Sequence, residues 1–157
     1  MQYRCILLFL ITLISVICPK TVAEQQKKQE TPAAITILLR TAQQGNAESQ
    51  AKLAQAYLEG RGVQQSDLEA AKWYRKAAEQ GNADAQSNLG VMYAQGKGVT
   101  QDYIQAHLWL NLSAAGLKGE EWEKAAKARD AVASKMTAQQ LAEAQRLARE
   151  WQSKRAK

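Results

Sequence analysis

The fold is decided by one stretch of sequence that occurs twice. Residues 45–80 read GNAESQAKLAQAYLEGRGVQQSDLEAAKWYRKAAEQ, and residues 81–116 read GNADAQSNLGVMYAQGKGVTQDYIQAHLWLNLSAAG. Without a gap, the two stretches share thirteen identical residues, which in the second stretch are Gly81, Asn82, Ala83, Gln86, Leu89, Tyr93, Gly96, Gly98, Val99, Gln101, Ala106, Trp109 and Ala114. A fixed period of 36 residues is typical of stacked supersecondary units. The duplication therefore predicts two full structural repeats.

Each repeat has the pattern of two helices joined by a glycine turn. In the first helix Gln50, Leu53 and Tyr57 recur at spacings of three and four, which places them on one face. The second helix carries small residues around a tryptophan, which predicts closely packed backbones with the indole between layers. Glycines such as Gly60 tolerate the left-handed conformation that ends a helix. We therefore predict an all-α fold, an α-solenoid of antiparallel helix hairpins.

Helix-capping residues support these boundaries. Ser66 with Glu69 has the spacing of a capping box, and Asp102 is predicted to cap the equivalent helix of the second repeat. Thr137 and Gln140 form a similar signature further along the chain. Helices are therefore predicted to begin directly after residues 66, 102 and 137.

The segments that flank the two repeats are predicted to be helical as well. Residues 33–44 align with the second helix of a full repeat and are interpreted as part of an incomplete leading unit. Residues 119–152 are predicted to form two C-terminal capping helices, with an acidic start that suits the positive end of a helix dipole. Repeat arrays need such a cap because an uncovered last layer exposes apolar surface. The covering stripe is predicted to consist of Leu141, Ala144, Ala148 and Trp151.

Residues 153–157 form a basic tail, in which positive side chains are favourable simply because they end a helix. The preceding helix lacks the bulky apolar face of a membrane-binding helix. The tail is therefore interpreted as a helix terminus, with contact to an anionic membrane or an acidic partner as the alternative.

The repeat resembles a known family at the positions that define it. Leu89, Gly90, Tyr93, Gly96, Gly98, Val99, Asp102, Ala106 and Trp109 are similar to the Sel1-like repeat, a relative of the tetratricopeptide repeat. The first repeat departs from that pattern at Ala54 and Ser66, and the second at Leu110, where a tyrosine is usual. The segment around Trp122 also looks like the closing segment of bacterial Sel1-like proteins. The resemblance implies a solenoid that holds a partner and does not catalyse a reaction.

The first 23 residues have the layout of a secretory signal peptide. Arg4 precedes the apolar run 5–18, and the small residue Ala23 is the predicted cleavage site. An uncleaved membrane anchor is the alternative, although the run of 14 residues is shorter than the roughly 20 needed to cross a bilayer. Residues 24–32 are polar and are predicted to form a flexible leader. The mature protein is predicted to be periplasmic or secreted and to contain no cysteine.

Few residues suit catalysis or cofactor binding. After cleavage the chain has one histidine, His107, and acids scattered at helix ends. We expect His107 to be a surface or edge side chain, and we predict no catalytic residue, no cofactor and no metal. The G-x-G turns are not phosphate loops, because no strand precedes them. The net charge of +6 is dispersed along the chain, which does not favour nucleic acid binding.

The predicted function is protein–protein interaction. In a curved solenoid the first helix of each unit lines the inner face, and at 100° per residue some side chains point away from Leu53 and Leu89. These predicted partner-contact residues are Gln55, Leu58, Glu59, Val91, Ala94 and Gln95. They suit a peptide segment or a neighbouring helix of another protein. The prediction is an adaptor or scaffold in the bacterial cell envelope.

Two other functions stay open. Some secreted Sel1-like proteins of a cysteine-rich branch bind or hydrolyse cell-wall-related compounds, although this chain lacks their paired cysteines. The second alternative is architectural, with the solenoid associating with further copies of itself end to end.

Overall fold

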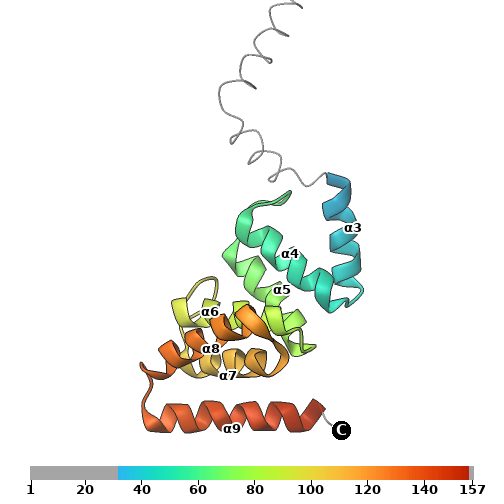
Figure 1. The fold of residues 1–157 in the computed structure, drawn as a ribbon. Helices are drawn as coiled ribbons and strands as arrows, with labels where there is room; N and C mark the ends of the chain where they lie inside the picture. Colours follow the sequence, from blue (N-terminus) through green and yellow to red (C-terminus); the bar gives the residue numbers. More distant parts are fainter. Residues whose placement is uncertain (1–31, 156–157) are drawn as a thin grey trace, which may run out of the picture.

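The computed structural model describes residues 32–155, which fold into helices and turns without a strand. The helices are α3 (Pro32–Gln43), α4 (Ala47–Glu59), α5 (Asp67–Glu79), α6 (Ala83–Gln95), α7 (Tyr103–Gly116), α8 (Gly119–Ala133) and α9 (Ala138–Arg155). Helices α4 and α5 form one hairpin, α6 and α7 form the next, and the two hairpins stack (Figure 1). The predicted α-solenoid is confirmed. The predicted signal peptide and all but the last residue of the predicted leader lie outside the described residues.

Side-chain caps fix where the helices begin. The Ser66 hydroxyl accepts a hydrogen bond from the Glu69 amide at 3.2 Å, and the Asp102 carboxylate accepts from the amides of Ile104 and Gln105. Both predicted caps are therefore confirmed. The predicted pair before α9 is confirmed too, because Gln140 N donates to Thr137 Oγ1 at 3.2 Å and Thr137 N donates to Gln140 Oε1 at 2.9 Å.

Two glutamines that are identical in both repeats connect successive helices. Gln50 Nε2 donates to the carbonyl of Ala42 at 3.0 Å, and Gln86 Nε2 donates to the carbonyl of Ala78 at 3.1 Å. Both glutamines are buried, so these bonds satisfy amides that water does not reach. Each first helix is thereby bonded to the end of the helix before it.

Glycine is required where the helices and turns approach most closely. A Cβ atom on Gly90 would lie 2.7 Å from Leu110 Cγ, which shows how tightly α6 packs on α7. Gly98 has a φ of +67°, and a Cβ atom there would lie 2.2 Å from the carbonyl oxygen of Asp67. The glycine turn of the second repeat therefore rests directly on the start of α5.

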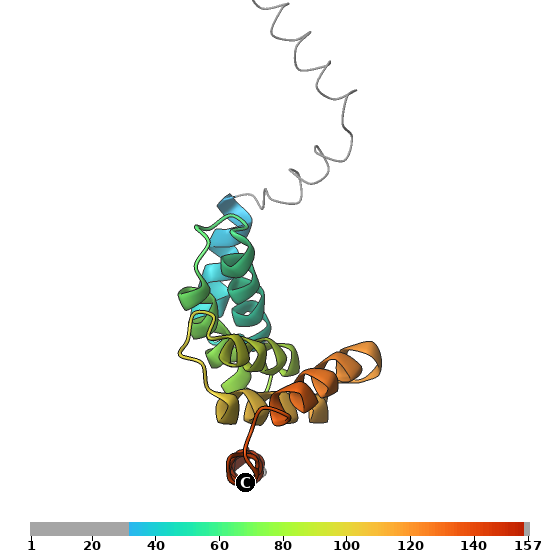
Figure 2. The same cartoon turned by 90° about the vertical axis from the view of Figure 1, so that its left-hand side faces the viewer.

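The last two helices cover opposite sides of α7 (Figure 2). Helix α8 packs along α7 on the side that faces away from α9. Helix α9 runs along α7 with Ala144 and Ala148 buried, and the Trp151 ring meets Trp109 edge to face at 6.3 Å. At its end, Arg155 Nη1 donates to the carbonyl of Glu79 at 3.0 Å. The end of α9 thus reaches the turn that follows α5.

Candidate functional site

An inner groove of 430 Å³ lies between α4 and the beginning of α6. Its floor is formed by Tyr74 of α5, a residue that is only 3% exposed. The groove is lined by Glu48, Ala51, Lys52, Gln55, Tyr74, Asn82, Asp84 and Asn88. Both full repeats contribute to it, so its shape depends on how the first hairpin stacks on the second.

The amide side chains of the inner groove use their N–H groups within their own helices. Gln55 Nε2 donates to Glu59 Oε1 at 2.9 Å, and Asn88 Nδ2 donates to the backbone carbonyl of Asp84 at 2.9 Å. Each of these amides keeps its carbonyl oxygen as an acceptor and its second N–H as a donor. The groove therefore presents acceptors and donors from both helices.

The charged groups of the inner groove are unevenly paired. Lys52 Nζ lies 2.6 Å from Glu48 Oε1, and this hydrogen bond and the lysine charge hold the pKa of Glu48 below its ordinary value. Within residues 32–155, the Asp84 carboxylate has no ion-pair partner. Asp84 is therefore the carboxylate of this groove that is available to another molecule.

The Tyr74 hydroxyl is a neutral donor at the groove floor. Burial, with smaller contributions from the charges of Glu59 and Asp84 and against the opposing charge of Arg61, raises the pKa of Tyr74 to about 12. The hydroxyl is thus protonated at neutral pH. No described residue forms a hydrogen bond with it, although the ring itself is buried.

The structure separates the six predicted partner-contact residues. Gln55 lines the inner groove, and Glu59 beside it is exposed. Leu58 is half-buried against the main core, whereas Val91 and Ala94 pack against a second cluster that includes Val132 of α8. The six predicted residues, Gln55, Leu58, Glu59, Val91, Ala94 and Gln95, therefore do not form one open face. Their role in partner contact stays a prediction.

Sequence reasoning missed the residues that line the same helical face closer to the start of each first helix. Lys52, Ala51 and Glu48 precede Gln55 by three, four and seven residues, and Asp84 and Asn88 precede Val91 similarly. That spacing was available in the sequence. The contribution of Tyr74 was hidden, because a tyrosine within an apolar stripe looks like an ordinary core residue.

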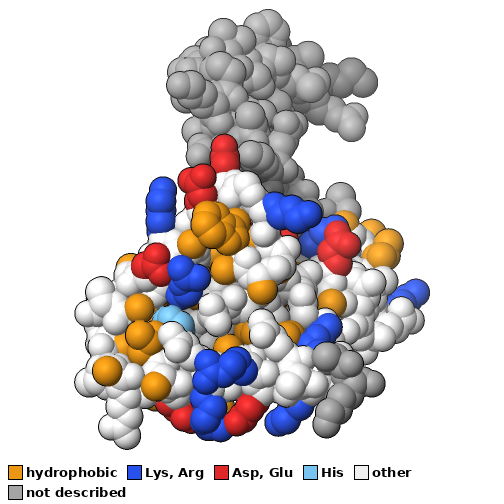
Figure 3. All heavy atoms as spheres, turned by 60° about the horizontal axis from the view of Figure 1, so that its bottom comes forward, with side chains coloured by type: hydrophobic (Ala, Val, Ile, Leu, Met, Phe, Trp, Pro, Cys, Tyr) orange, Lys and Arg blue, Asp and Glu red, His pale blue; other side chains and the backbone are white. Residues whose placement is uncertain are grey.

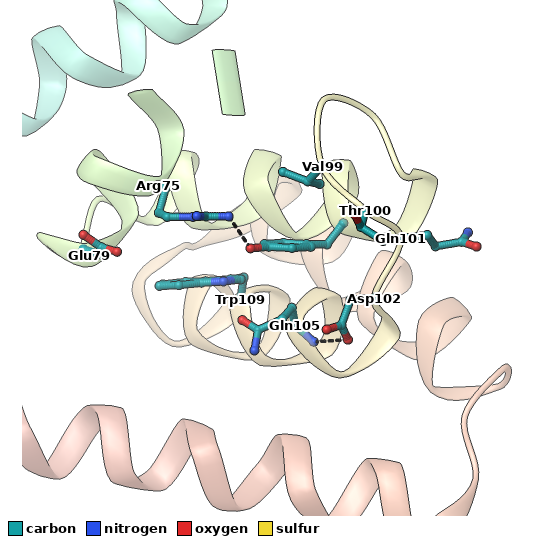
Figure 4. Close-up of a pocket in the computed structure, with 9 residues that line it drawn as sticks. Arg75, Glu79, Val99, Thr100, Gln101, Asp102, Gln105 and Trp109 are labelled. Atoms are coloured by element: carbon teal, nitrogen blue, oxygen red, sulfur yellow. Dashed lines mark hydrogen bonds between the residues drawn. The ribbon is translucent and has the colours of Figure 1, made fainter. Parts of the chain in front are cut away.

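A second groove, of 660 Å³, lies between α5, α7 and the glycine turn of the second repeat (Figure 4). Arg75 reaches across it to donate a hydrogen bond to the Tyr93 hydroxyl, and its guanidinium carbon lies 5.8 Å from the centre of that ring. Asp102, also in this groove, is used in capping α7. Arg75, Tyr93 and Asp102 of the second groove are thus already bonded to other groups of the chain.

His107 does not lie at the surface, and that expectation is wrong. The side chain of His107 is 4% exposed, and α8 packs against the helix that carries it. The equivalent residue of the first repeat, Ala71, is buried as well. Burial lowers the pKa of His107, the charge of Arg129 lowers it further, and Asp130 opposes both. Its Nδ1 atom has no hydrogen-bond partner among the described residues.

Metal and membrane sites were also sought within residues 32–155. No three His, Asp or Glu side chains in this range are placed to hold a metal ion. Each helix in the range is too short or too polar to span a bilayer. On the face drawn in Figure 3, basic and acidic side chains are interspersed, and Arg146 of α9 is paired with both Glu143 and Glu150.

Comparison with known proteins identifies the repeats. The family model described as Sel1 repeat matches residues 47–82 and 83–116. A protective antigen of uropathogenic Escherichia coli strains that displays an SLR fold is 34% identical, with a TM-score of 0.71 over 79% of this chain and 26% of that one. A Sel1 repeat protein from Oxalobacter formigenes is 34% identical, with a TM-score of 0.55 over 57% of this chain and 37% of that one. Among curated proteins there was no significant match.

The chain thus spans 26% and 37% of the lengths of these two proteins. Sel1 repeats generally mediate protein–protein interaction. With two matched repeats, the stacked hairpins described above and these structural neighbours, residues 47–116 are two repeats of the Sel1-like family.

Proposed function

We propose that this protein is an exported adaptor that binds a segment of a partner protein in the inner groove. The observation that carries the proposal is the set of polar groups in this groove that the fold does not use. The Asp84 carboxylate and the Tyr74 hydroxyl have no hydrogen-bond or ion-pair partner within residues 32–155, and the carbonyl oxygens of the Gln55 and Asn88 side chains accept no hydrogen bond from a described residue. In the second groove, by contrast, the tyrosine hydroxyl is already bonded to Arg75.

The proposed export rests on the first 23 residues. Their basic start, apolar run and small residue at position 23 support export to the periplasm or beyond. An inner groove of 430 Å³ supports a modest and reversible contact with a short segment, as expected for interfaces of small area.

Site-specific photo-crosslinking in the native organism tests the proposal. A photoreactive amino acid is placed at Lys52 in the inner groove and, as a control, at Gln145 on the exposed face of α9. We expect a crosslinked partner from position 52 and none from position 145. The proposal fails if both positions capture the same proteins, or if only position 145 captures one.

Self-association is a second candidate function, and one observation favours it. Among the described residues, α3 is the first helix, and it has the place of a second helix of a repeat. Its Ile37 is 62% exposed, whereas the equivalent Trp109 is 7% exposed. Light scattering of the mature protein and of an Ile37→Lys variant would show whether copies associate through α3.

A further inference from the structure

Carboxylates are the more numerous charged groups in the inner groove. Glu48 and Asp84 supply carboxylates, Gln55 and Asn88 supply carbonyl oxygens, and Lys52, the one cation among the described residues that line the groove, is paired with Glu48. The Asp84 carboxylate is therefore the charge in this groove without an ion-pair partner among the described residues, and the two carbonyl oxygens add hydrogen-bond acceptors beside it. A group that carries several donors and a positive charge is the complement of such a surface.

The hydroxyl of Tyr74 adds a second and independent feature. The residue is 97% buried as the complement of its 3% exposure, yet it lines the groove, and its hydroxyl has no hydrogen-bond partner among the described residues. A buried ring of this kind is rigid, so its oxygen is held in place before any partner arrives. Tyr74 also has no equivalent in the second repeat, where Leu110 takes its position and is fully buried.

The second groove shows how the same chemistry is satisfied inside the chain. There the Tyr93 hydroxyl accepts a hydrogen bond from Arg75, whose guanidinium carbon lies 5.8 Å from the centre of the tyrosine ring (Figure 4). Tyr93 and Arg75 thus form a tyrosine–arginine pair within one chain. Tyr74 differs in that its hydroxyl has no hydrogen bond with a described arginine, although the charge of Arg61 acts on it.

We propose that the inner groove binds an arginine side chain from an extended segment of the partner protein, with Asp84 as its counter-ion and Tyr74, Gln55 and Asn88 as its hydrogen-bond acceptors. A guanidinium has five N–H donors in a planar arrangement, more than the three of a lysine ammonium. The site is thus specific for both charge and donor number. This inference rests on the proposed function, because it names the chemical group that the adaptor holds.

Peptide titration followed by NMR tests the inference. The probes are acetylated and amidated alanine pentapeptides with a central arginine or with a central citrulline, which has the same shape without the charge. We expect the arginine peptide to shift the side-chain amide signals of Gln55 and Asn88 and to bind about tenfold more tightly than the citrulline peptide. This preference should weaken as the salt concentration rises.

Three variants complete the experiment. Asp84→Asn should reduce the affinity for the arginine peptide about tenfold, and Tyr74→Phe should reduce it without loss of helical signal. Glu120→Gln removes a carboxylate from the first turn of α8, the helix position that Asp84 has in α6, and should bind like the wild type. Equal binding of the two peptides, or unchanged binding by Asp84→Asn, overturns the inference.

The two proposals fail in distinguishable ways. If a partner crosslinks at position 52 but arginine and citrulline peptides bind alike, only the arginine assignment is wrong. If no partner crosslinks there and one is captured from position 145, the adaptor proposal is wrong as well.

Discussion

Replacement of Gly98 by alanine should destabilise the protein more than replacement of any exposed turn glycine. Gly98 has a φ of +67°, and the new Cβ atom would lie 2.2 Å from the carbonyl oxygen of Asp67 and 2.9 Å from the amide nitrogen of Leu68. Both of these are backbone atoms at the start of α5, so no side chain can rotate to relieve the contact. The turn of the second repeat would have to lift away from the first repeat.

The expected cost has two parts. A residue with a Cβ atom in the left-handed region costs roughly 1–2 kcal/mol. Relief of an overpacked contact typically adds about 1–3 kcal/mol. Gly98→Ala should therefore lower the free energy of unfolding by about 2–5 kcal/mol.

Gly45→Ala separates the two parts. Gly45 has a φ of +95°, but a Cβ atom there would have no neighbour within 4 Å, so only the backbone cost of roughly 1–2 kcal/mol applies. Urea unfolding of both variants, followed by far-ultraviolet circular dichroism, measures the difference. If the two alanine variants lose equal stability, the close contact between the glycine turn and α5 does not exist as described.

Three further predictions concern the core. Gln86→Leu removes the bond to the Ala78 carbonyl and should lower the free energy of unfolding by about 1–3 kcal/mol in urea titrations, because a buried acceptor is left unsatisfied. Trp151→Ala should cost about 2–3 kcal/mol by the same measurement and should increase the exposure of the Trp109 fluorophore to acrylamide quenching. Because burial lowers the pKa of His107 in the folded state, the unfolded chain takes up its proton first, so stability should be constant above about pH 6.5 and should fall below it. In a His107→Gln variant, the urea midpoint should no longer fall below about pH 6.5. If the fall persists in that variant, another group causes it.

The repeats and the caps could be predicted from the sequence because their signals are local. Alignment of the sequence with itself at a shift of 36 residues revealed the repeated hairpin. Ser66 and Asp102 predicted where helices begin, because their side chains accept hydrogen bonds from backbone amides a few residues further along the chain. Such interactions depend on spacing along one helix. They therefore do not depend on which other helices pack against that helix.

The candidate site was harder to predict because it depends on neighbouring layers. Leu58 and Ala94 point away from the hairpin partner on an isolated helix, yet both are half-buried, because the following unit packs against them. His107 was misjudged for the same reason, since it lies on α7, against which α6, α8 and α9 all pack. Tyr74 shows the limit most clearly, because its ring belongs to the core while its hydroxyl opens into the inner groove.

The bond between Arg155 and the carbonyl of Glu79 joins residues that are 76 positions apart. In a simple solenoid each unit touches only its neighbours, so the ends can fray independently of the middle. The end of α9 is instead hydrogen-bonded to the junction of the two repeats, so it holds the last helix to a unit that is not its neighbour in sequence. Pulling the chain by its two ends should therefore release α9 first, and only then should the hairpins come apart one by one.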